Sequence, residues 1–295
     1  MKRTIKNIIT IITIASLAAV MLPACAQNST EATTAKAEET TTDKVEESAS
    51  SAEKSAETGD RLSEIKKRGY LLVGTEGTWS PYTYHDENDQ LVGFEVDVAK
   101  LIADHIGVDV KYSETVWSSI FASLDAGQID VIVNGVSKTQ EREEKYDFSE
   151  PYNYSQYAMF ARADDDSIQS LDDVNGKIAS NDPTSTIGAF AEEHGVKFDE
   201  VSEMAQSISE VLNGRSDVTF NTQVALFDYL KQHPENKDKL KIIVVTDPMP
   251  NAYVPVVKGN DDLVQEINAA IDEAKQNGTL SDLAVKYFDV DTTKG

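Results

Sequence analysis

The feature that most constrains this sequence is an alternation of short apolar runs with longer amphipathic stretches after residue 60. The first apolar run, Leu71 to Gly74, is typical of a buried strand. Two stretches with apolar side chains at helical spacing follow, each ended by a glycine and each followed by another strand-like run. In chain order these segments are 71–74, 94–105, 108–112, 120–124 and 129–133. The order strand, helix, strand, helix, strand predicts an α/β fold with a largely parallel sheet.

A second set of the same kind follows, and two amphipathic helices end the chain. Its predicted strands cover residues 177–180, 218–220, 241–245 and 253–257, and its predicted helices cover residues 187–193, 208–212 and 224–231. The terminal helices cover residues 263–271 and 280–288. Two α/β units joined by crossing strands would leave a cleft between them, which is a usual place for a ligand.

The first 25 residues predict export from the cytoplasm. A positively charged start precedes an apolar run over residues 8–22, which is about the length of a signal-peptide core. The run ends in Leu22-Pro23-Ala24, directly before Cys25, the only cysteine in the chain. This spacing resembles the lipobox of bacterial lipoproteins. It implies a signal peptide over residues 1–24 and a lipid, such as palmitate, on Cys25. The alternative is a plain secretory signal. A single cysteine excludes an intramolecular disulfide.

The next segment is unsuited to a core. Residues 26–60 contain no aromatic side chain, and Val45 is their only large aliphatic one, so burial cannot offset the entropy of ordering. Residues 25–60 are therefore expected to form a disordered, lipid-anchored tether. The net charge of −24 would repel nucleic acid, so no nucleic-acid partner is expected. No other apolar stretch approaches membrane-spanning length, so membrane contact is expected through the lipid only.

Several motifs after residue 60, taken in order, resemble the solute-binding proteins of polar amino-acid ABC importers. The likeness spans about residues 64–288. The matching segments are Val73–Tyr82 (VGTEGTWSPY), Gly93–Ala99 (GFEVDVA), Leu124–Val131 (LDAGQIDV), Thr139–Arg142 (TQER), Phe148–Tyr152 (FSEPY), Gly278–Leu280 (GTL) and Lys286–Phe288 (KYF). Residues 76–78 and 228–231 look most like the cystine-type branch.

The resemblance implies a periplasmic-binding-protein clamp, in which two α/β lobes joined by two crossover strands close on a ligand. Lobe 1 would comprise residues 61–157 and 251–295, and lobe 2 residues 158–250. The implied function is an extracytoplasmic receptor, anchored to the cell membrane, that delivers a polar amino acid, with cystine as a candidate, to an ABC permease. A monomer without a cofactor and without enzymatic activity is expected.

The resemblance also assigns the charged and aromatic contacts of the ligand. Arg142 would hold the ligand carboxylate, because a planar guanidinium can grip it with two parallel bonds. The alternative is a surface arginine paired with Glu141 or Glu144. Trp79 and Trp117 would stack on the apolar part of the ligand, unless they are ordinary core residues. We expect Trp117 in the loop before a helix that starts near Ser118.

Polar contacts complete the expected site. Glu76 would lie near the ammonium group, although a carboxylate at a strand end is more often simply solvated. Gly135 and Ser137 would offer backbone and hydroxyl groups, and Thr184 and Ser185 would open a helix whose N-terminus suits an anion. At Thr222 most relatives carry an aspartate that pairs with the ammonium. Either Glu76 takes over that role, or the ligand is not a standard α-amino acid.

Two other function classes compete with this interpretation. One is a small-acid dehydratase on the same fold, with Glu76 as general acid or base, because fold does not determine function. The other is a sensor or adhesin that binds without transport. Motifs for metal or nucleotide chemistry are missing: the sequence contains neither a phosphate loop nor a Gly-x-Ser-x-Gly elbow. The four histidines are not at metal-ligand spacing; they are His85, His105, His194 and His233.

Overall fold

The structure is a computed structural model and describes residues 61–294. The predicted signal peptide over residues 1–24, the lipid site Cys25 and the tether over residues 25–60 lie outside the described residues. Within residues 61–294, every helix is too short or too polar to cross a bilayer.

The first of two five-stranded sheets carries strands from both ends of the described chain. The strand β1 (Tyr70–Thr75) pairs in parallel with β5 (Asp109–Glu114) and with β6 (Val131–Ile132). The strand β15 (Pro255–Val257) then runs antiparallel between β6 and β7 (Tyr146–Phe148), so the sheet order is β5-β1-β6-β15-β7.

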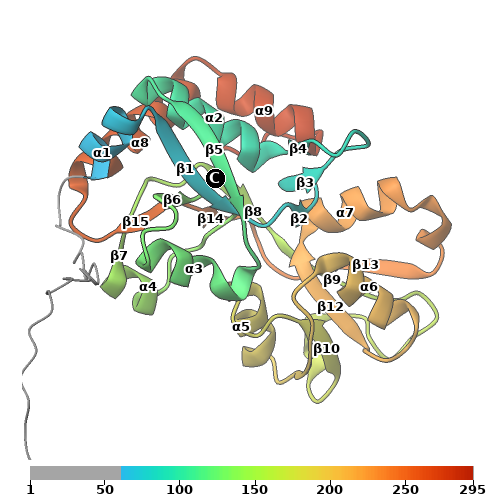
Figure 1. Cartoon of the computed structure of the whole chain (residues 1–295). Helices are drawn as coiled ribbons and strands as arrows, with labels where there is room; N and C mark the ends of the chain where they lie inside the picture. Colours follow the sequence, from blue (N-terminus) through green and yellow to red (C-terminus); the bar gives the residue numbers. More distant parts are fainter. Residues whose placement is uncertain (1–60, 295) are drawn as a thin grey trace, which may run out of the picture. The chain divides into compact units, whose positions relative to one another are not determined.

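Helices cover both faces of this sheet. In Figure 1, α2 (Phe94–Ile106) and α9 (Thr279–Phe288) lie on one side of β1 and β5, and α3 (Trp117–Asp125) lies on the other. The remaining helices of this region are α1 (Arg61–Arg68), α4 (Gln140–Lys145) and α8 (Asp261–Gln276).

The sequence of α2 explains both its length and its burial. Phe94, Val98 and Ile102 recur at helical spacing and are fully buried in the core. Gly107 ends the helix with φ 83°, a left-handed conformation that glycine adopts without strain. Helix α8 packs against α2, and its own apolar stripe joins the same core.

The second sheet repeats the arrangement of the first. Its strands are β9 (Tyr157–Arg162), β10 (Ile178–Asn181), β11 (Lys197–Glu200), β12 (Val218–Thr222) and β13 (Leu240–Val244), in the order β11-β10-β12-β9-β13. Here β10 pairs in parallel with β11 and β12, whereas β9 is antiparallel to β12 and β13. The helices are α5 (Thr186–Glu193), α6 (Met204–Leu212) and α7 (Gln223–Gln232).

Two antiparallel strands separate the two sheets along the chain. The strand β8 (Asn153–Ser155) leads to the second sheet, and β14 (Met249–Ala252), which pairs with β8, leads back to the first. In each sheet one strand runs antiparallel to its neighbours: β15 in the first sheet and β9 in the second. The predicted α/β class and the two lobes are confirmed. Both sheets are mixed, but four of the five strands in each run in one direction. The residue boundaries of the lobes stay a prediction.

Smaller elements complete the fold. A three-stranded sheet joins β2 (Thr78–Trp79), β3 (Thr83–His85) and β4 (Leu91–Val92), beside the end of β1. Two short 3-10 helices, η1 (Leu171–Val174) and η2 (Pro234–Asn236), lie in the second lobe.

Candidate ligand-binding site

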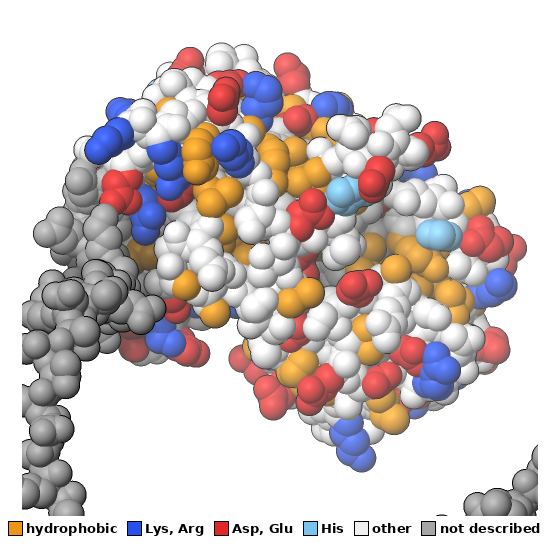
Figure 2. All heavy atoms as spheres, in the orientation of Figure 1, with side chains coloured by type: hydrophobic (Ala, Val, Ile, Leu, Met, Phe, Trp, Pro, Cys, Tyr) orange, Lys and Arg blue, Asp and Glu red, His pale blue; other side chains and the backbone are white. Residues whose placement is uncertain are grey.

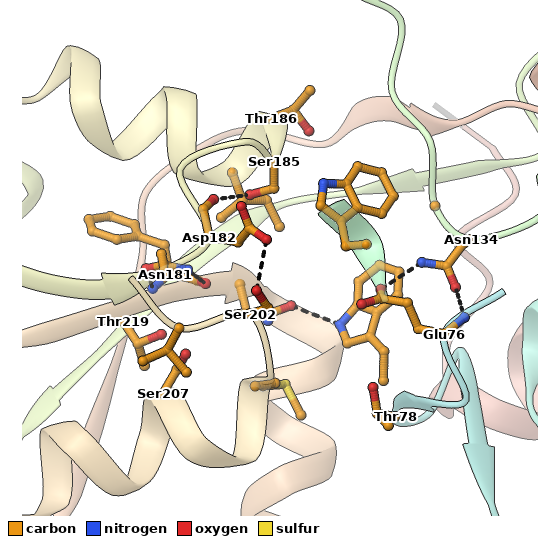
Figure 3. Close-up of a pocket in the computed structure, with 18 residues that line it drawn as sticks. Glu76, Thr78, Asn134, Asn181, Asp182, Ser185, Thr186, Ser202, Ser207 and Thr219 are labelled. Atoms are coloured by element: carbon orange, nitrogen blue, oxygen red, sulfur yellow. Dashed lines mark hydrogen bonds between the residues drawn. The ribbon is translucent and has the colours of Figure 1, made fainter. Parts of the chain in front are cut away.

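A pocket of about 100 Å³ lies where the carboxyl ends of strands from both sheets meet. Figure 3 shows its two walls, one with Glu76, Thr78 and Asn134 and one with Asn181, Ser207 and Thr219. In the first set Glu76 follows β1, Thr78 begins β2 (Thr78–Trp79) and Asn134 lies just after β6. The second set comes from β10, α6 and β12. The two lobes therefore both contribute to the pocket.

Glu76 is held in the pocket by Asn134. The amide nitrogen of Asn134 donates to Oε2 of Glu76 at 2.7 Å, while its Oδ1 accepts from the backbone nitrogen of Glu76 at 2.9 Å. Burial raises the pKa of Glu76 above its ordinary value, although the bond from Asn134 lowers it, and the nearby charges of Asp182 and Glu203 raise it further. A cation in the pocket would relieve both the desolvation and the repulsion. The sequence alternative of a simply solvated carboxylate does not describe Glu76.

Both tryptophans line the pocket. The Trp79 ring stacks on Tyr82 with centroids 4.1 Å apart, and its Nε1 donates to Oδ1 of Asn221 in the second lobe at 3.1 Å. Trp117 is the first residue of α3, so the expectation that it precedes the helix is corrected by one residue. Its ring lies edge-on to Phe121, with centroids 6.0 Å apart. Both rings are only partly buried, so each keeps surface for a ligand.

Gly135 lines the pocket because its backbone passes against the Trp79 ring. An added Cβ would lie 2.6 Å from Cζ3 of Trp79, and the residue has φ 58°. A side chain at this position would therefore displace the tryptophan as well as strain the backbone.

Arg142 and Thr184 line an adjoining hollow of about 700 Å³, which shares Ser185 and Thr186 with the pocket. Nη1 of Arg142 donates to the Ser137 carbonyl at 3.0 Å, and the guanidinium lies 4.8 Å from the Phe121 ring centroid. Burial lowers the pKa of Arg142, which reflects the desolvation of its charge.

No carboxylate of residues 61–294 lies within 4.0 Å of the Arg142 guanidinium, so the pairing with Glu141 or Glu144 weighed from the sequence is not formed. Glu141 instead pairs with Lys145. Arg142 is thus a desolvated cation whose remaining donors are available to an anion.

Ser137 and Thr222 do not line the pocket. The Ser137 hydroxyl donates to the Asn251 carbonyl at 3.1 Å. Thr222 is fully buried, and its Oγ1 accepts from the Tyr82 hydroxyl at 3.1 Å and from the backbone nitrogen of Ala225 at 3.3 Å. Thr222 therefore caps α7 and contacts the first lobe through a neutral hydrogen bond.

The sequence pattern of the bacterial extracellular solute-binding proteins, family 3, matches residues 71–290. The chain belongs to this family. It is 39% identical to the L-cystine-binding protein TcyA of Bacillus subtilis (strain 168) over 241 residues, which cover 81% of this chain and 89% of that protein. The predicted family and two-lobed fold are confirmed. The relatives are solute-binding proteins of transport systems, which supports a receptor over an enzyme.

Solved structures agree with this family. The L-cystine solute receptor of Neisseria gonorrhoeae, unliganded and open, is 37% identical, with a TM-score of 0.56, and the match covers 81% of this chain and 100% of that chain. An ancestral arginine-binding protein bound to arginine is 35% identical, with a TM-score of 0.70, and the match covers 75% of this chain and 99% of that chain.

Sequence reasoning missed several polar residues that line this family-3 pocket. Asp182 directly follows β10 and Asn134 lies two residues after β6, positions that could have identified them as candidates. Ser207 and Thr219 lie within a helix and a strand, and nothing in the sequence pattern distinguishes them from ordinary polar positions. Ser202 completes this set.

Proposed function

We propose that this chain is an extracytoplasmic receptor that binds L-cystine and delivers it to the permease of an ABC importer. The observation that carries the proposal is the pairing of opposite charges about one site: the desolvated Glu76 carboxylate in the pocket and the desolvated Arg142 guanidinium in the hollow that adjoins it. An α-amino acid head presents a carboxylate, which is complementary to the Arg142 guanidinium, and an ammonium group, which is complementary to the Glu76 carboxylate.

Each group of the amino-acid head has a suitable partner. The guanidinium of Arg142 can donate two parallel bonds to the ligand carboxylate, and the carboxylate of Glu76 can accept from the ammonium. This arrangement does not need an aspartate at position 222, where the neutral Thr222 contacts Tyr82 instead. Glu76 thus replaces the usual aspartate as the partner of the ammonium group, which is the first of the two alternatives that the sequence left open.

The centre of the pocket suits the disulfide of cystine. The Trp79 and Trp117 rings and the Met204 thioether line it, and polarizable sulfur packs favourably against aromatic rings. The names of TcyA and of the gonococcal receptor as cystine-binding proteins support this choice among amino acids.

The location of the receptor is also a proposal. A signal peptide over residues 1–24, a lipid on Cys25 and a tether over residues 25–60 would hold lobe 1 (residues 61–157 and 251–295) and lobe 2 (158–250) outside the cytoplasmic membrane. This organisation follows from the N-terminal sequence and from the extracellular family.

The proposal is tested by ligand-dependent stabilisation. Every sample carries Cys25→Ala, because a free thiol would exchange with the disulfide of the ligand. L-Cystine is expected to raise the melting temperature, and to raise it further with the logarithm of its concentration above the Kd, whereas L-glutamine and L-arginine at the same concentration raise it less. A shift with arginine or glutamine but not with cystine would contradict the ligand assignment. Binding of cystine by cells that show no uptake dependent on this protein would indicate the sensor or adhesin.

A further inference from the structure

Two largely buried residues of the pocket carry hydroxyl groups that have no partner among residues 61–294. Ser207 on α6 is 3% exposed and Thr219 on β12 is 1% exposed, and both line the pocket. Figure 3 shows them next to each other on the wall formed by the second lobe. Within residues 61–294 neither side chain makes a hydrogen bond, whereas the buried Thr75 and Thr222 hydroxyls each make two. A hydroxyl group that lines a pocket without a protein partner can donate to a ligand, so these two are suited to a partner that enters the pocket.

A carboxylate lies on the same side of the pocket. Asp182 follows β10, and its Oδ2 accepts from the Ser202 hydroxyl at 3.0 Å. Its Oδ1 accepts from the backbone nitrogen and hydroxyl of Thr184 at 2.8 and 2.6 Å. A carboxylate offers about four acceptor positions, so one more donor can be accommodated.

Asp182 has no ion-pair partner among the described residues 61–294. No lysine, arginine or histidine of the described chain lies within 4.0 Å of its carboxylate. Glu76 is the other carboxylate that lines the pocket, and it comes from the opposite lobe. The Asp182 charge contributes to the raised pKa of Glu76, which shows that the two groups interact. A ligand with one ammonium group neutralises one of them, and a ligand with two neutralises both.

We propose that Ser207, Thr219 and Asp182 form a second polar subsite, which holds the second amino-acid head of a double-headed ligand. Asp182 accepts from the second ammonium group, and the hydroxyls of Ser207 and Thr219 donate to the second carboxylate. The inference rests on the proposed function, because Glu76 and Arg142 hold the first head. It makes the second lobe selective for ligands that carry two amino-acid heads.

The test compares two ligands that differ only in the second head. L-Cystine has two, and S-methylthio-L-cysteine keeps the disulfide but has one. Isothermal titration of the full chain with Cys25→Ala measures both affinities for each variant. Ser207→Ala and Thr219→Val are each expected to reduce the ratio of cystine affinity to S-methylthio-L-cysteine affinity about ten- to a hundredfold, as for one lost hydrogen bond to a charged group. Thr219→Ser retains the hydroxyl and is expected to keep the wild-type ratio.

Two further variants serve as controls. Ser209→Ala is the same substitution on the same helix, at a residue that does not line the pocket, and is expected to keep the ratio. Glu76→Gln is expected to weaken both ligands, because both carry the first head. Circular dichroism and thermal unfolding establish that each variant is folded.

Three results overturn the inference. If Ser207→Ala and Thr219→Val both leave the affinity ratio unchanged, the hydroxyls do not contact the second head. If the wild type binds both ligands equally, the second head is not recognised, while the proposed cystine receptor stands. If the wild type binds neither ligand, the proposed function fails, and the subsite fails with it.

Discussion

The two lobes of this protein share one strand arrangement but bury different polar chemistry. The first lobe buries two carboxylates, Glu95 and Asp130. In the second lobe the buried polar side chains of the described chain are all neutral; they are Ser180, Asn181, Ser207, Ser216, Thr219, Thr222 and Asn236. Equivalent topology therefore does not impose equivalent chemistry.

The same contrast extends to the pocket. The first lobe contributes the desolvated Glu76 and both tryptophans to the pocket, and the desolvated Arg142 to the hollow beside it. The second lobe contributes hydroxyl groups and a single half-buried carboxylate, Asp182. The comparison suggests that the first lobe supplies most of the affinity and that the second lobe selects among the ligands.

The largest expected effect concerns the cation of the first lobe. Arg142→Ala should reduce the affinity for cystine by about 2–5 kcal/mol, because the ligand carboxylate would lose its desolvated partner. The control is Arg215→Ala, which removes an exposed arginine of the second lobe that is paired with Glu210. Calorimetry should show no change for this control. An Arg142→Ala variant that folds and binds cystine within twofold of the wild type would contradict the role of Arg142. The proposed difference in binding charge between the two lobes would then not hold.

The next effect concerns the pH dependence of stability. Glu95 is fully buried, and burial raises its pKa to about 7 even though the Tyr152 hydroxyl donates to it. Between the ordinary value near 4.5 and about 7, the folded state binds more protons than the unfolded state. Glu95 therefore favours folding at low pH, and this contribution is lost as pH rises to about 7, by on the order of 2–3 kcal/mol.

Glu95→Gln should remove this dependence. The free energy of unfolding of the variant minus that of the wild type should be more positive at pH 8 than at pH 5. Urea unfolding of both proteins at both pH values measures this difference. The control, Glu192→Gln, alters an exposed glutamate on α5 of the second lobe and should preserve the wild-type dependence. If Glu95→Gln retains the wild-type difference between the two pH values, the first lobe does not carry this buried charge.

The smallest expected effect concerns the contact between the lobes. Tyr82→Phe removes the bond from the Tyr82 hydroxyl to Oγ1 of Thr222 and should lower the free energy of unfolding by about 1 kcal/mol. Thr222→Val removes the same bond and also the cap of α7, so it should lower the free energy of unfolding by about 2 kcal/mol. Because both substitutions remove the same bond, the double variant should lose less than the sum of the two. A tenfold loss of cystine affinity in Thr222→Val, with little loss of stability, would instead place Thr222 on the ligand.

Much of the fold could be predicted from the sequence because helix and strand patterns are local. The helix predicted over 94–105 is observed over 94–106, and the one predicted over 187–193 is observed over 186–193. The helix predicted from 208 begins at Met204, one turn earlier, and Met204 packs with Ile208 and Val211 in the same cluster. The small sheet over residues 78–92 was not predicted, because its strands have two or three residues each and give no clear period.

The candidate site divides in the same way. Glu76, Trp79, Trp117, Gly135 and Ser185 line the pocket as expected, and Arg142 and Thr184 line the hollow beside it. These residues either belong to the family motifs or lie close to the end of a strand or helix. From the sequence alone, side chains at such positions are expected to be exposed at one edge of a sheet. Which of them contact the ligand stays a prediction.

The sequence by itself determined the α/β alternation, the glycine-terminated helices, the acidic charge and the family motifs, because each depends on neighbours within a few positions. Only the tertiary structure decided that Thr222 contacts Tyr82, 140 residues away in the chain, and that Ser207 and Thr219 face one cavity. Those placements depend on the packing of α6 against β10 and β12 and on the contact between the lobes. A hydroxyl group has the same identity in a solvated turn and in a dry pocket, and only long-range packing separates the two.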